Sequence, residues 1–211
     1  MADLNAIAEL EQSAWPAYLR ASSSTLEQRL HWQHIMLGAF KAEQLVGIAS
    51  WRYDQFDPTV PMPKSFDAFA NRPNQDGYNA AYVYNFAITP KIRNTRHGLE
   101  LALQLIAEGI KILIRDHCTY LVGASRCPSY DGSEQDHAKP SSELKIAIDT
   151  CAASKATLVD ATLPWQNDPV LSFYKHALHC SYLEALPAFM PEDTASGGYA
   201  IGFYKVLGKP A

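Results

Sequence analysis

AAYVYNFAITPKIRNTRHG, residues 80–98, is the stretch of this sequence that decides the fold. Its first nine residues, Ala80 to Ile88, are rich in β-branched and aromatic side chains and predict a central strand. Thr89 and Pro90 end that strand, because proline has no N–H to give to a sheet. The basic and polar residues from Lys91 to His97 predict a turn. The chain therefore passes from a buried strand to an exposed basic turn within a few residues.

The residues after this turn complete a strand–helix–strand unit. From Gly98 to Asp116 the apolar residues recur at helical spacing. Tyr120 to Ser125 (YLVGAS) then predicts the next buried strand. A βαβ unit is therefore expected at the centre of the chain.

Further helices and strands flank this unit on both sides. Apolar spacing predicts an amphipathic helix over residues 3–20, and SSST at 22–25 is a turn and capping signal. Two long loops, over 54–79 and 127–140, are typical of functional or mobile segments. The other predicted elements are a hairpin (His34 to Phe40 with Leu45 to Tyr53), a short helix around Ser65 to Ala70, helices at Ser141 to Ala153 and Asp168 to Leu178, and a closing strand at Gly198 to Leu207.

The composition is that of an ordinary globular protein. With 211 residues, 47% hydrophobic and 19% charged, we expect a single domain over residues 1–211. The formal net charge of -4 argues against a general nucleic-acid binder. The acidic N-terminal stretch is unlike a signal peptide, and no apolar run approaches the roughly 20 residues of a membrane span. No two of the four cysteines have C-x-x-C spacing, so we expect no metal site. Because neither a signal peptide nor a membrane span is indicated, we expect a cytoplasmic location with reduced thiols.

The basic turn suits a phosphate group. The N-terminus of a helix presents N–H groups without a helical partner and carries a partial positive charge. Arg93 and Arg96 would add charge-assisted contacts to phosphate oxygens. From these residues alone, a phosphate site and a merely solvated basic cap both stay open.

The same residues carry a family resemblance. Ile88-x-Pro90-x-x-Arg93-x-x-Arg96-x-Gly98 resembles the acyl-CoA motif of the Gcn5-related N-acetyltransferase (GNAT) family. Arg96 stands where that family usually has a glycine that lets the backbone approach the pyrophosphate, and an arginine there can bind phosphate or weaken the site. The resemblance implies contacts to acetyl-CoA or another acyl-CoA by Phe86, Ala87, Ile88, Arg93, Asn94, Thr95, Arg96, His97, Gly98 and Leu99.

A second segment is similar to another motif of the same family. Asn167-Asp-Pro-Val170-Leu-Ser-Phe-Tyr174-Lys matches Asn-x-x-Ala-x-x-x-Tyr-Glu-Lys, with the spacing from Asn167 to Tyr174 preserved. The resemblance implies that Asn167 contacts the pantetheine arm and that Tyr174 lies by the thioester sulfur. A phenol with a pKa near about 10 can protonate the departing CoA thiolate.

The resemblance covers most of the chain and implies its fold. That fold is α+β, with a central twisted mixed sheet that is mostly antiparallel, contains one splayed parallel strand pair and is flanked by helices. Some GNAT domains, including those fused to nitrilase-type amidohydrolases, are more similar still. They share three stretches, which here are RCPSY (Arg126 to Tyr130), DPVLSF (Asp168 to Phe173) and LPAFMPEDTASGGY (Leu186 to Tyr199).

The implied activity is N-acetyl transfer from acetyl-CoA to a small amine or a peptide-like acceptor. The amine attacks the thioester directly, so the enzyme contributes mainly positioning and polarisation of the carbonyl. Many relatives use a carboxylate on or near the central strand as the base, but Ala80–Ile88 contains no acid. Tyr84, Tyr82, an ordered water or Asp131 are the candidates.

Other activities and an assembly state stay open on the sequence. The chain can be a non-catalytic acyl-CoA-binding module, because Arg96 replaces a glycine and the central strand lacks an acid. It can also transfer longer acyl chains, since its two long loops would allow a wider tunnel. A homodimer is possible, and neither nucleic acid nor a membrane is expected as a partner.

Overall fold

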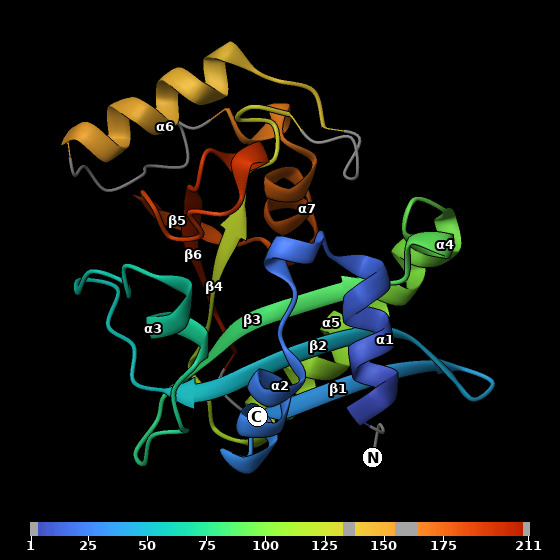
Figure 1. The fold of residues 1–211 in the computed structure, drawn as a ribbon. Coiled ribbons are helices and arrows are strands. Elements are labelled where there is room, and N and C mark those ends of the chain that lie inside the picture. Colours follow the sequence, from blue (N-terminus) through green and yellow to red (C-terminus); the bar gives the residue numbers. More distant parts are fainter. Residues whose placement is uncertain (1–3, 133–137, 155–163, 209–211) are drawn as a thin grey trace. The chain divides into compact units, whose positions relative to one another are not determined.

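The computed structural model describes residues 4–132, 138–154 and 164–208 (Figure 1). The chain divides into two compact units, and each is described by itself. The prediction of a single domain stays a prediction. The first unit is Met1–Phe56, Ala70–Leu121 and Leu207–Ala211, and the second is Asp57–Phe69 and Val122–Val206.

The strands belong to a six-stranded sheet of order β1-β2-β3-β4-β6-β5. The pairs β1–β2, β2–β3 and β5–β6 are antiparallel, whereas helices connect β3 to β4, as a crossover between parallel strands requires. This mixed sheet with helices confirms the predicted α+β fold class. The elements are α1 (Leu4–Ala14), η1 (Ala17–Leu19), α2 (Ser23–His31), β1 (Ile35–Lys41), β2 (Gln44–Asp54), α3 (Phe66–Ala70), β3 (Ala80–Ile88), α4 (Pro90–Arg93), α5 (Arg96–Arg115), β4 (Tyr120–Arg126), α6 (Ser142–Ser154), η2 (Trp165–Asn167), α7 (Pro169–Leu178), β5 (Ser181–Leu186), η3 (Thr194–Ser196) and β6 (Ala200–Val206).

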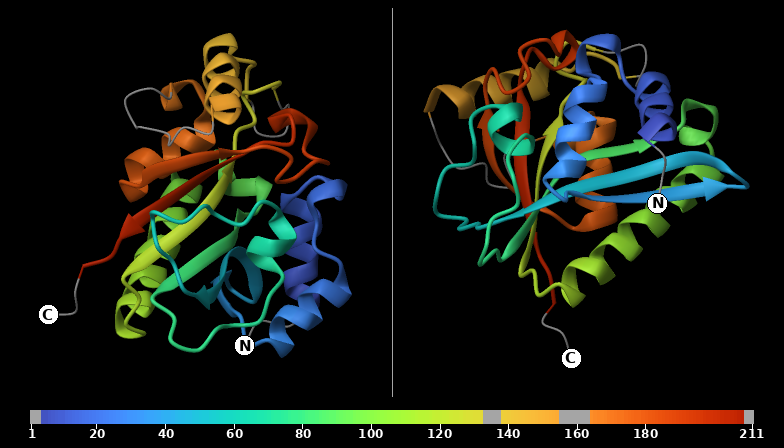
Figure 2. Two further views of the ribbon diagram at one scale, coloured as in Figure 1. Left: turned by 90° about the vertical axis from the view of Figure 1, so that its left-hand side faces the viewer. Right: turned by 60° about the horizontal axis from the view of Figure 1, so that its bottom comes forward.

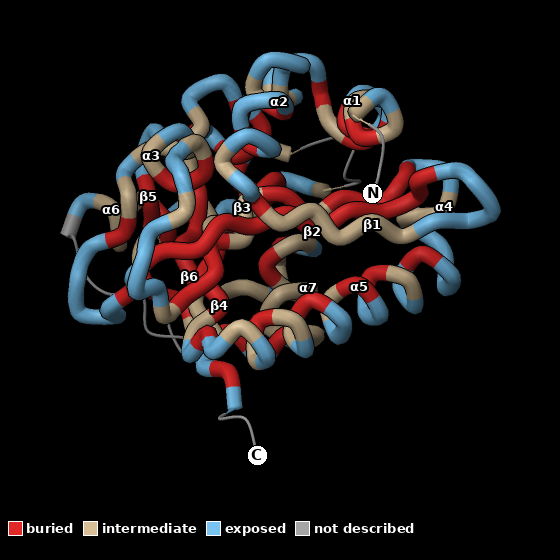
Figure 3. Tube along the Cα trace, turned by 90° about the horizontal axis from the view of Figure 1, so that it is seen from below, coloured by how far each residue is buried: buried red, intermediate tan, exposed pale blue. Residues whose placement is uncertain are grey.

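In the first unit, helices cover both faces of the strands β1, β2 and β3. Helices α1 and α2 lie on one face and α5 lies on the other (Figure 3). Apolar residues at helical spacing turn one side of α1 towards the sheet. The core on this face consists of Ile7, Leu10, Ala14, Leu26, Leu45, Ile48 and Ala87.

Two predicted helix boundaries in this unit are wrong. The amphipathic helix predicted over 3–20 ends at Ala14, because Pro16 lacks the N–H that a continuing helix needs. The turn predicted up to His97 is mostly helical: Pro90 starts the short helix α4, and α5 begins at Arg96 rather than at Gly98. The capping signal at 22–25 is real, since Ser22 Oγ accepts a hydrogen bond from the backbone N–H of Thr25 at the start of α2.

The central strand β3 has the predicted bounds and contains a bulge. Ser50 of β2 pairs with Asn85, but the next residue, Trp51, pairs with Val83. Tyr84 is therefore the extra residue on β3. Such bulges re-aim side chains and are common beside active sites.

The second unit contains β5, β6 and the helices α6 and α7 (Figure 2). The predicted closing strand is confirmed at Ala200–Val206, and it pairs with β5, a strand that we did not predict. Gly123 of β4 has no side chain because the ring of Phe203 occupies the place that a Cβ would take. In this unit the Phe203 ring of β6 therefore packs directly on the backbone of β4 at Gly123.

Candidate functional site

The turn after β3 is built by two threonines. Thr89 is the N-cap residue of α4, and Pro90 occupies the first helical position, where its missing N–H costs nothing. Thr95 caps α5, since its Oγ1 accepts the Gly98 N–H at 3.1 Å and donates to the Ile92 carbonyl at 2.7 Å. The N–H groups of residues 96 and 97 lie in the first turn of α5, where a helix offers them no acceptor.

Gly98 is required by contact with the preceding turn. A Cβ on this residue would overlap the Ile92 carbonyl oxygen and would lie 3.0 Å from Arg93 Cα. Both are backbone atoms, which cannot rotate away. Gly98 therefore lets α4 pack directly against the start of α5. This packing fixes the position of Thr95 relative to the α5 N-terminus.

Replacing Gly98 by alanine should destabilise the protein by about 1–3 kcal/mol, because the clash with the Ile92 carbonyl overpacks the turn. Gly109 is the matched control on the same helix, since a Cβ there would meet only Trp51 Cζ3, at 3.9 Å. At that position alanine should stabilise the protein by about 0.5–1 kcal/mol through its higher helix propensity. Urea denaturation measures both changes, and equal effects of the two substitutions would refute the argument.

The two arginines of the basic turn differ in their surroundings. The Arg96 side chain is 93% exposed and pairs with Glu100 at 2.9 Å. Arg93 is half-buried, and its Nη1 lies 3.5 Å from the Ala14 carbonyl. Exposed ion pairs such as that of Arg96 contribute only about 0–1 kcal/mol, so its guanidinium can turn to another anion at little cost.

The second predicted segment opens helix α7 in the second unit. Asp168 is its N-cap: Oδ1 accepts the N–H groups of Val170 and Leu171 at 2.9 and 3.0 Å. Asn167 directs its side-chain amide to Ser141 Oγ at 3.3 Å and to Glu143 at 3.0 Å. Both bonds use Nδ2, so the predicted pantetheine contact would use Oδ1 or would need the amide N–H groups to exchange partners, and it stays a prediction.

Tyr174 lies on α7 and packs against an aromatic ring of β6. Its ring centroid is 4.6 Å from that of Phe203, with an interplanar angle of 32°. Its hydroxyl makes no hydrogen bond to another described residue, and burial raises the pKa of the phenol above its usual value. The group therefore stays protonated at neutral pH, as a proton donor must.

The three stretches RCPSY, DPVLSF and LPAFMPEDTASGGY meet in the second unit. Arg126 forms two hydrogen bonds to Asp193, at 2.7 and 3.0 Å, and both residues are buried. Asp168 Oδ2 accepts the Ser129 N–H at 2.7 Å. The third link joins the Cys127 N–H to Ser196 Oγ at 3.2 Å. In this unit the three stretches thus position α7 and the loop before β6.

The candidates for the base have different environments. Asp131 is exposed and pairs with Lys145 at 2.8 Å. Burial raises the pKa of Tyr84, and burial together with the nearby Asp54 carboxylate raises the pKa of Tyr82 to about 12. At neutral pH both phenols therefore keep their protons, and a protonated phenol is a weak base. The role of Tyr82 or Tyr84 as the base stays a prediction.

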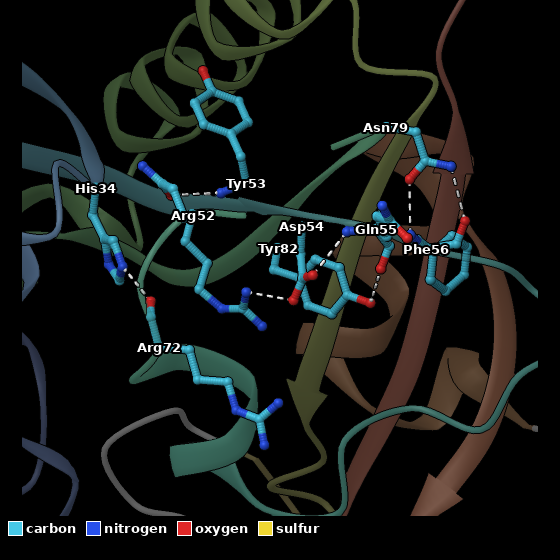
Figure 4. Close-up of polar contacts among 10 residues, drawn as sticks. His34, Arg52, Tyr53, Asp54, Gln55, Phe56, Arg72, Asn79 and Tyr82 are labelled. Atoms are coloured by element: carbon cyan, nitrogen blue, oxygen red, sulfur yellow. Dashed lines mark hydrogen bonds and ion pairs between the residues drawn. The ribbon is translucent and has the colours of Figure 1, made fainter. Parts of the chain in front are cut away.

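The sequence analysis missed a group of buried polar side chains around β3. Glu11, Arg29, His34 and Asn85 are between 3% and 8% exposed. The backbone carbonyl of Arg72 lies 2.8 Å from His34 Nε2 (Figure 4). On the other side of the ring, the Tyr84 hydroxyl lies 3.0 Å from Nδ1. One signal was visible in the sequence: Glu11 falls on the apolar face of its helix, beside Leu10 and Ala14.

Within the described residues, no group of three or more His, Cys, Asp or Glu side chains could hold a metal ion. None of the four cysteines, all of which lie in the described part of the chain, forms a disulfide: Cys118, Cys127, Cys151 and Cys180. The same part of the chain has no helix long and apolar enough to cross a membrane.

Comparison with known proteins identifies the fold. No family model and no curated protein matches the chain. Among solved structures, the loading GNATL domain of CurA from Lyngbya majuscula matches with a TM-score of 0.71 at 14% identity, covering 97% of this chain and 93% of that one. The chain has the GNAT fold. The GNAT-like decarboxylase GphF, in complex with isobutyryl-CoA, is 20% identical with a TM-score of 0.66, covering 98% of this chain and 95% of that one. The aminoglycoside 6'-N-acetyltransferase from Enterococcus faecium is 12% identical with a TM-score of 0.62, covering 99% and 92%.

Proposed function

We propose that this GNAT-fold chain is an acyl-CoA-dependent N-acyltransferase that moves an acetyl group to an amine. One observation carries the proposal: in this fold, β3 is followed through the short helix α4 by the N-terminus of α5, which Thr95 caps, Gly98 packs tightly and Arg96 flanks. N–H groups at a helix start and nearby guanidinium groups are suited to phosphate oxygens. Solved neighbours include complexes with coenzyme A and isobutyryl-CoA, and several are named as acetyltransferases.

The roles of the residues follow from the chemistry of the cosubstrate. Arg93, Arg96 and the start of α5 would hold the pyrophosphate, and the backbone from Phe86 to Ile88 would hold the pantetheine arm. Tyr174 would protonate the sulfur as the thiolate leaves, which its raised pKa allows. Asn167 would contact the arm. The acceptor is a small amine or a peptide-like amine.

Titration of the protein with acetyl-CoA, followed by a thiol-release assay over a panel of amines, tests the proposal. We expect saturable binding and release of free CoA that requires both acetyl-CoA and an amine. Absence of acetyl-CoA binding would refute the proposal. Binding without turnover for any amine would favour a non-catalytic acyl-CoA-binding module instead.

Arg96 and Arg115 form a matched pair for the phosphate contact. Both are exposed arginines of α5 that pair with one carboxylate, but they lie at opposite ends of the helix. Arg96→Ala should weaken acetyl-CoA binding about tenfold, the loss of one charge-assisted hydrogen bond, and should reduce its salt dependence. Arg115→Ala should leave the affinity unchanged. Equal affinities of the two variants by calorimetry would show that Arg96 does not contact the ligand.

A second candidate is decarboxylation of an acyl-CoA that carries a carboxyl group. It is favoured by one of the solved neighbours, which is named as a GNAT-like decarboxylase. Release of CO₂ from a carboxyacyl-CoA without any amine would support it. Mass spectrometry of ligand retained through purification would also reveal a longer acyl chain.

A further inference from the structure

A buried carboxylate from another element lies against the central strand. Glu11 of α1 is 4% exposed, and its Oε1 accepts a hydrogen bond from Asn85 Nδ2 at 2.5 Å. Its Oε2 lies 3.3 Å from the Ala21 N–H. Asn85 is itself oriented by Trp15, whose Nε1 donates to Asn85 Oδ1 at 3.3 Å. A carboxylate has about four acceptor positions, so these two bonds leave Glu11 able to accept another proton.

The place of this carboxylate along β3 matters. Asn85 directly follows the bulge residue Tyr84 and directly precedes Phe86. The basic turn, which would hold the pyrophosphate, follows Ile88 at the other end of β3. An acyl-CoA whose arm follows Phe86 to Ile88 away from its pyrophosphate would bring its thioester end towards the bulge, where Glu11 is fixed.

We propose that Glu11, held against β3 by Asn85, is the base that accepts the proton of the attacking amine. The proposal rests on the proposed acyl transfer and adds the proton acceptor that Ala80–Ile88 does not contain. Helix α1, which packs on one face of the sheet, supplies this proton acceptor. The attacking group must then carry a removable proton on nitrogen, which makes primary and secondary amines the acceptor class.

Atoms and electrons balance in this step. The amine nitrogen forms a bond to the thioester carbon while the π electrons of the carbonyl move onto oxygen. The N–H proton passes to the Glu11 carboxylate. The oxyanion then re-forms the carbonyl, the C–S bond breaks, and the sulfur takes its electron pair and a proton from the general acid. Amide and free CoA result, and the two protein groups exchange their protons with solvent.

The neighbouring groups make Glu11 a better proton acceptor than His34 or Tyr84. Burial raises the pKa of Glu11, against the lowering effects of the Ala21 and Asn85 hydrogen bonds and of Arg29 and Arg20. Burial, helped by the Arg29 and Arg52 charges, lowers the pKa of His34 to about 4 against the raising effect of the Arg72 carbonyl. A proton that enters this cluster therefore neutralises the Glu11 carboxylate. On His34 it would instead add a positive charge near Arg29.

The hydrogen bonds of His34 make Tyr84 a hydrogen-bond donor in this cluster rather than a base. A backbone carbonyl only accepts, so the Arg72 carbonyl fixes the proton of His34 on Nε2, and Nδ1 must accept from the Tyr84 hydroxyl. Tyr84 thus donates its proton inward to His34. The charged or titratable groups that act on Glu11 are Arg29 from α2, Arg20 from the segment before α2 and Tyr84 from β3.

Glu11→Gln tests the proposal, with Glu9→Gln as the matched control, since Glu9 lies on the same helix, outside its buried face. In the acetyl-CoA and amine assay, we expect Glu11→Gln to lower kcat at least about 100-fold while the KM for acetyl-CoA changes little. Glu9→Gln should behave as wild type. The wild-type profile of kcat/KM should fall at acidic pH, because the base must be deprotonated, and Glu11→Gln should lose this acidic limb.

The outcomes separate this proposal from the one it rests on. If the wild type transfers acetyl groups and folded Glu11→Gln keeps its rate and its acidic limb, only the role of Glu11 is overturned. If the wild type neither binds acetyl-CoA nor turns over, both proposals fail. Should Glu11→Gln not fold, Glu11→Asp decides: the shorter carboxylate should lower kcat while the KM for acetyl-CoA changes little and the acidic limb remains, and an unchanged kcat would overturn the proposal.

Discussion

Replacement of Asp193 by asparagine is expected to lower the free energy of unfolding by about 3–5 kcal/mol. Asp193 is fully buried and holds the Arg126 guanidinium in two hydrogen bonds, at 2.7 and 3.0 Å. Asparagine keeps the shape of the side chain but leaves the arginine charge buried without its counter-charge. For a chain of this length the loss corresponds to a fall in Tm of about 10 °C.

Glu192→Gln is the control for this prediction, because it removes one charge from the adjacent, exposed residue. Its effect on the unfolding free energy should stay within about 0.5 kcal/mol. Chemical denaturation followed by circular dichroism measures both variants. Hydrogen exchange should show the loss first at the Ser129 and Asp131 amides, which bond to Asp168 and Ala195 in the same cluster. A change below about 1 kcal/mol for Asp193→Asn would mean that the ion pair does not hold this unit together.

Tyr174→Phe is expected to lower kcat for acetyl transfer by about 100-fold or more while the Kd for acetyl-CoA stays within about threefold. Phenylalanine keeps the packing on Phe203 and removes only the hydroxyl, which makes no hydrogen bond to another described residue. The variant therefore loses a proton donor without a structural bond. Pre-steady-state kinetics and calorimetry separate the two constants.

The pH dependence of this variant has a definite sign. Burial raises the pKa of Tyr174, so the alkaline limb of the wild-type rate should begin only at strongly alkaline pH, where the phenol loses its proton. Tyr174→Phe should lack that alkaline limb. Tyr204→Phe, at the residue that follows Phe203 in the same strand, should keep both the rate and the limb. A full rate for Tyr174→Phe would show that Tyr174 is not the general acid.

The elements that were predicted correctly are those marked by local sequence patterns. The β-branched and aromatic run Ala80–Ile88 is a strand with those same bounds, and the hairpin of β1 and β2 follows from two apolar runs separated by a short polar turn. Helix α7 starts where Asp168 and Pro169 place it. These signals are local because strand preference, capping and the missing N–H of proline act within a few residues.

The boundaries that failed depended on closer detail. Pro16 ends α1 early, although the apolar spacing continues beyond it. Helix α4 formed within a turn that looked merely basic, because Thr89 and Pro90 suit the start of a helix. The strand β5 was missed because its six residues become a strand only through pairing with β6.

Side-chain partners far apart in the sequence were decided by the tertiary structure alone. Glu11 and Asn85 are 74 positions apart, and Arg126 and Asp193 are 67 apart. Spacing along a chain carries no information on such pairs, because the distance between them depends on how the elements pack. The residues from Pro90 to Gly98 could thus be singled out by their own chemistry, whereas the acid that faces β3 appeared only once α1 had packed against the sheet.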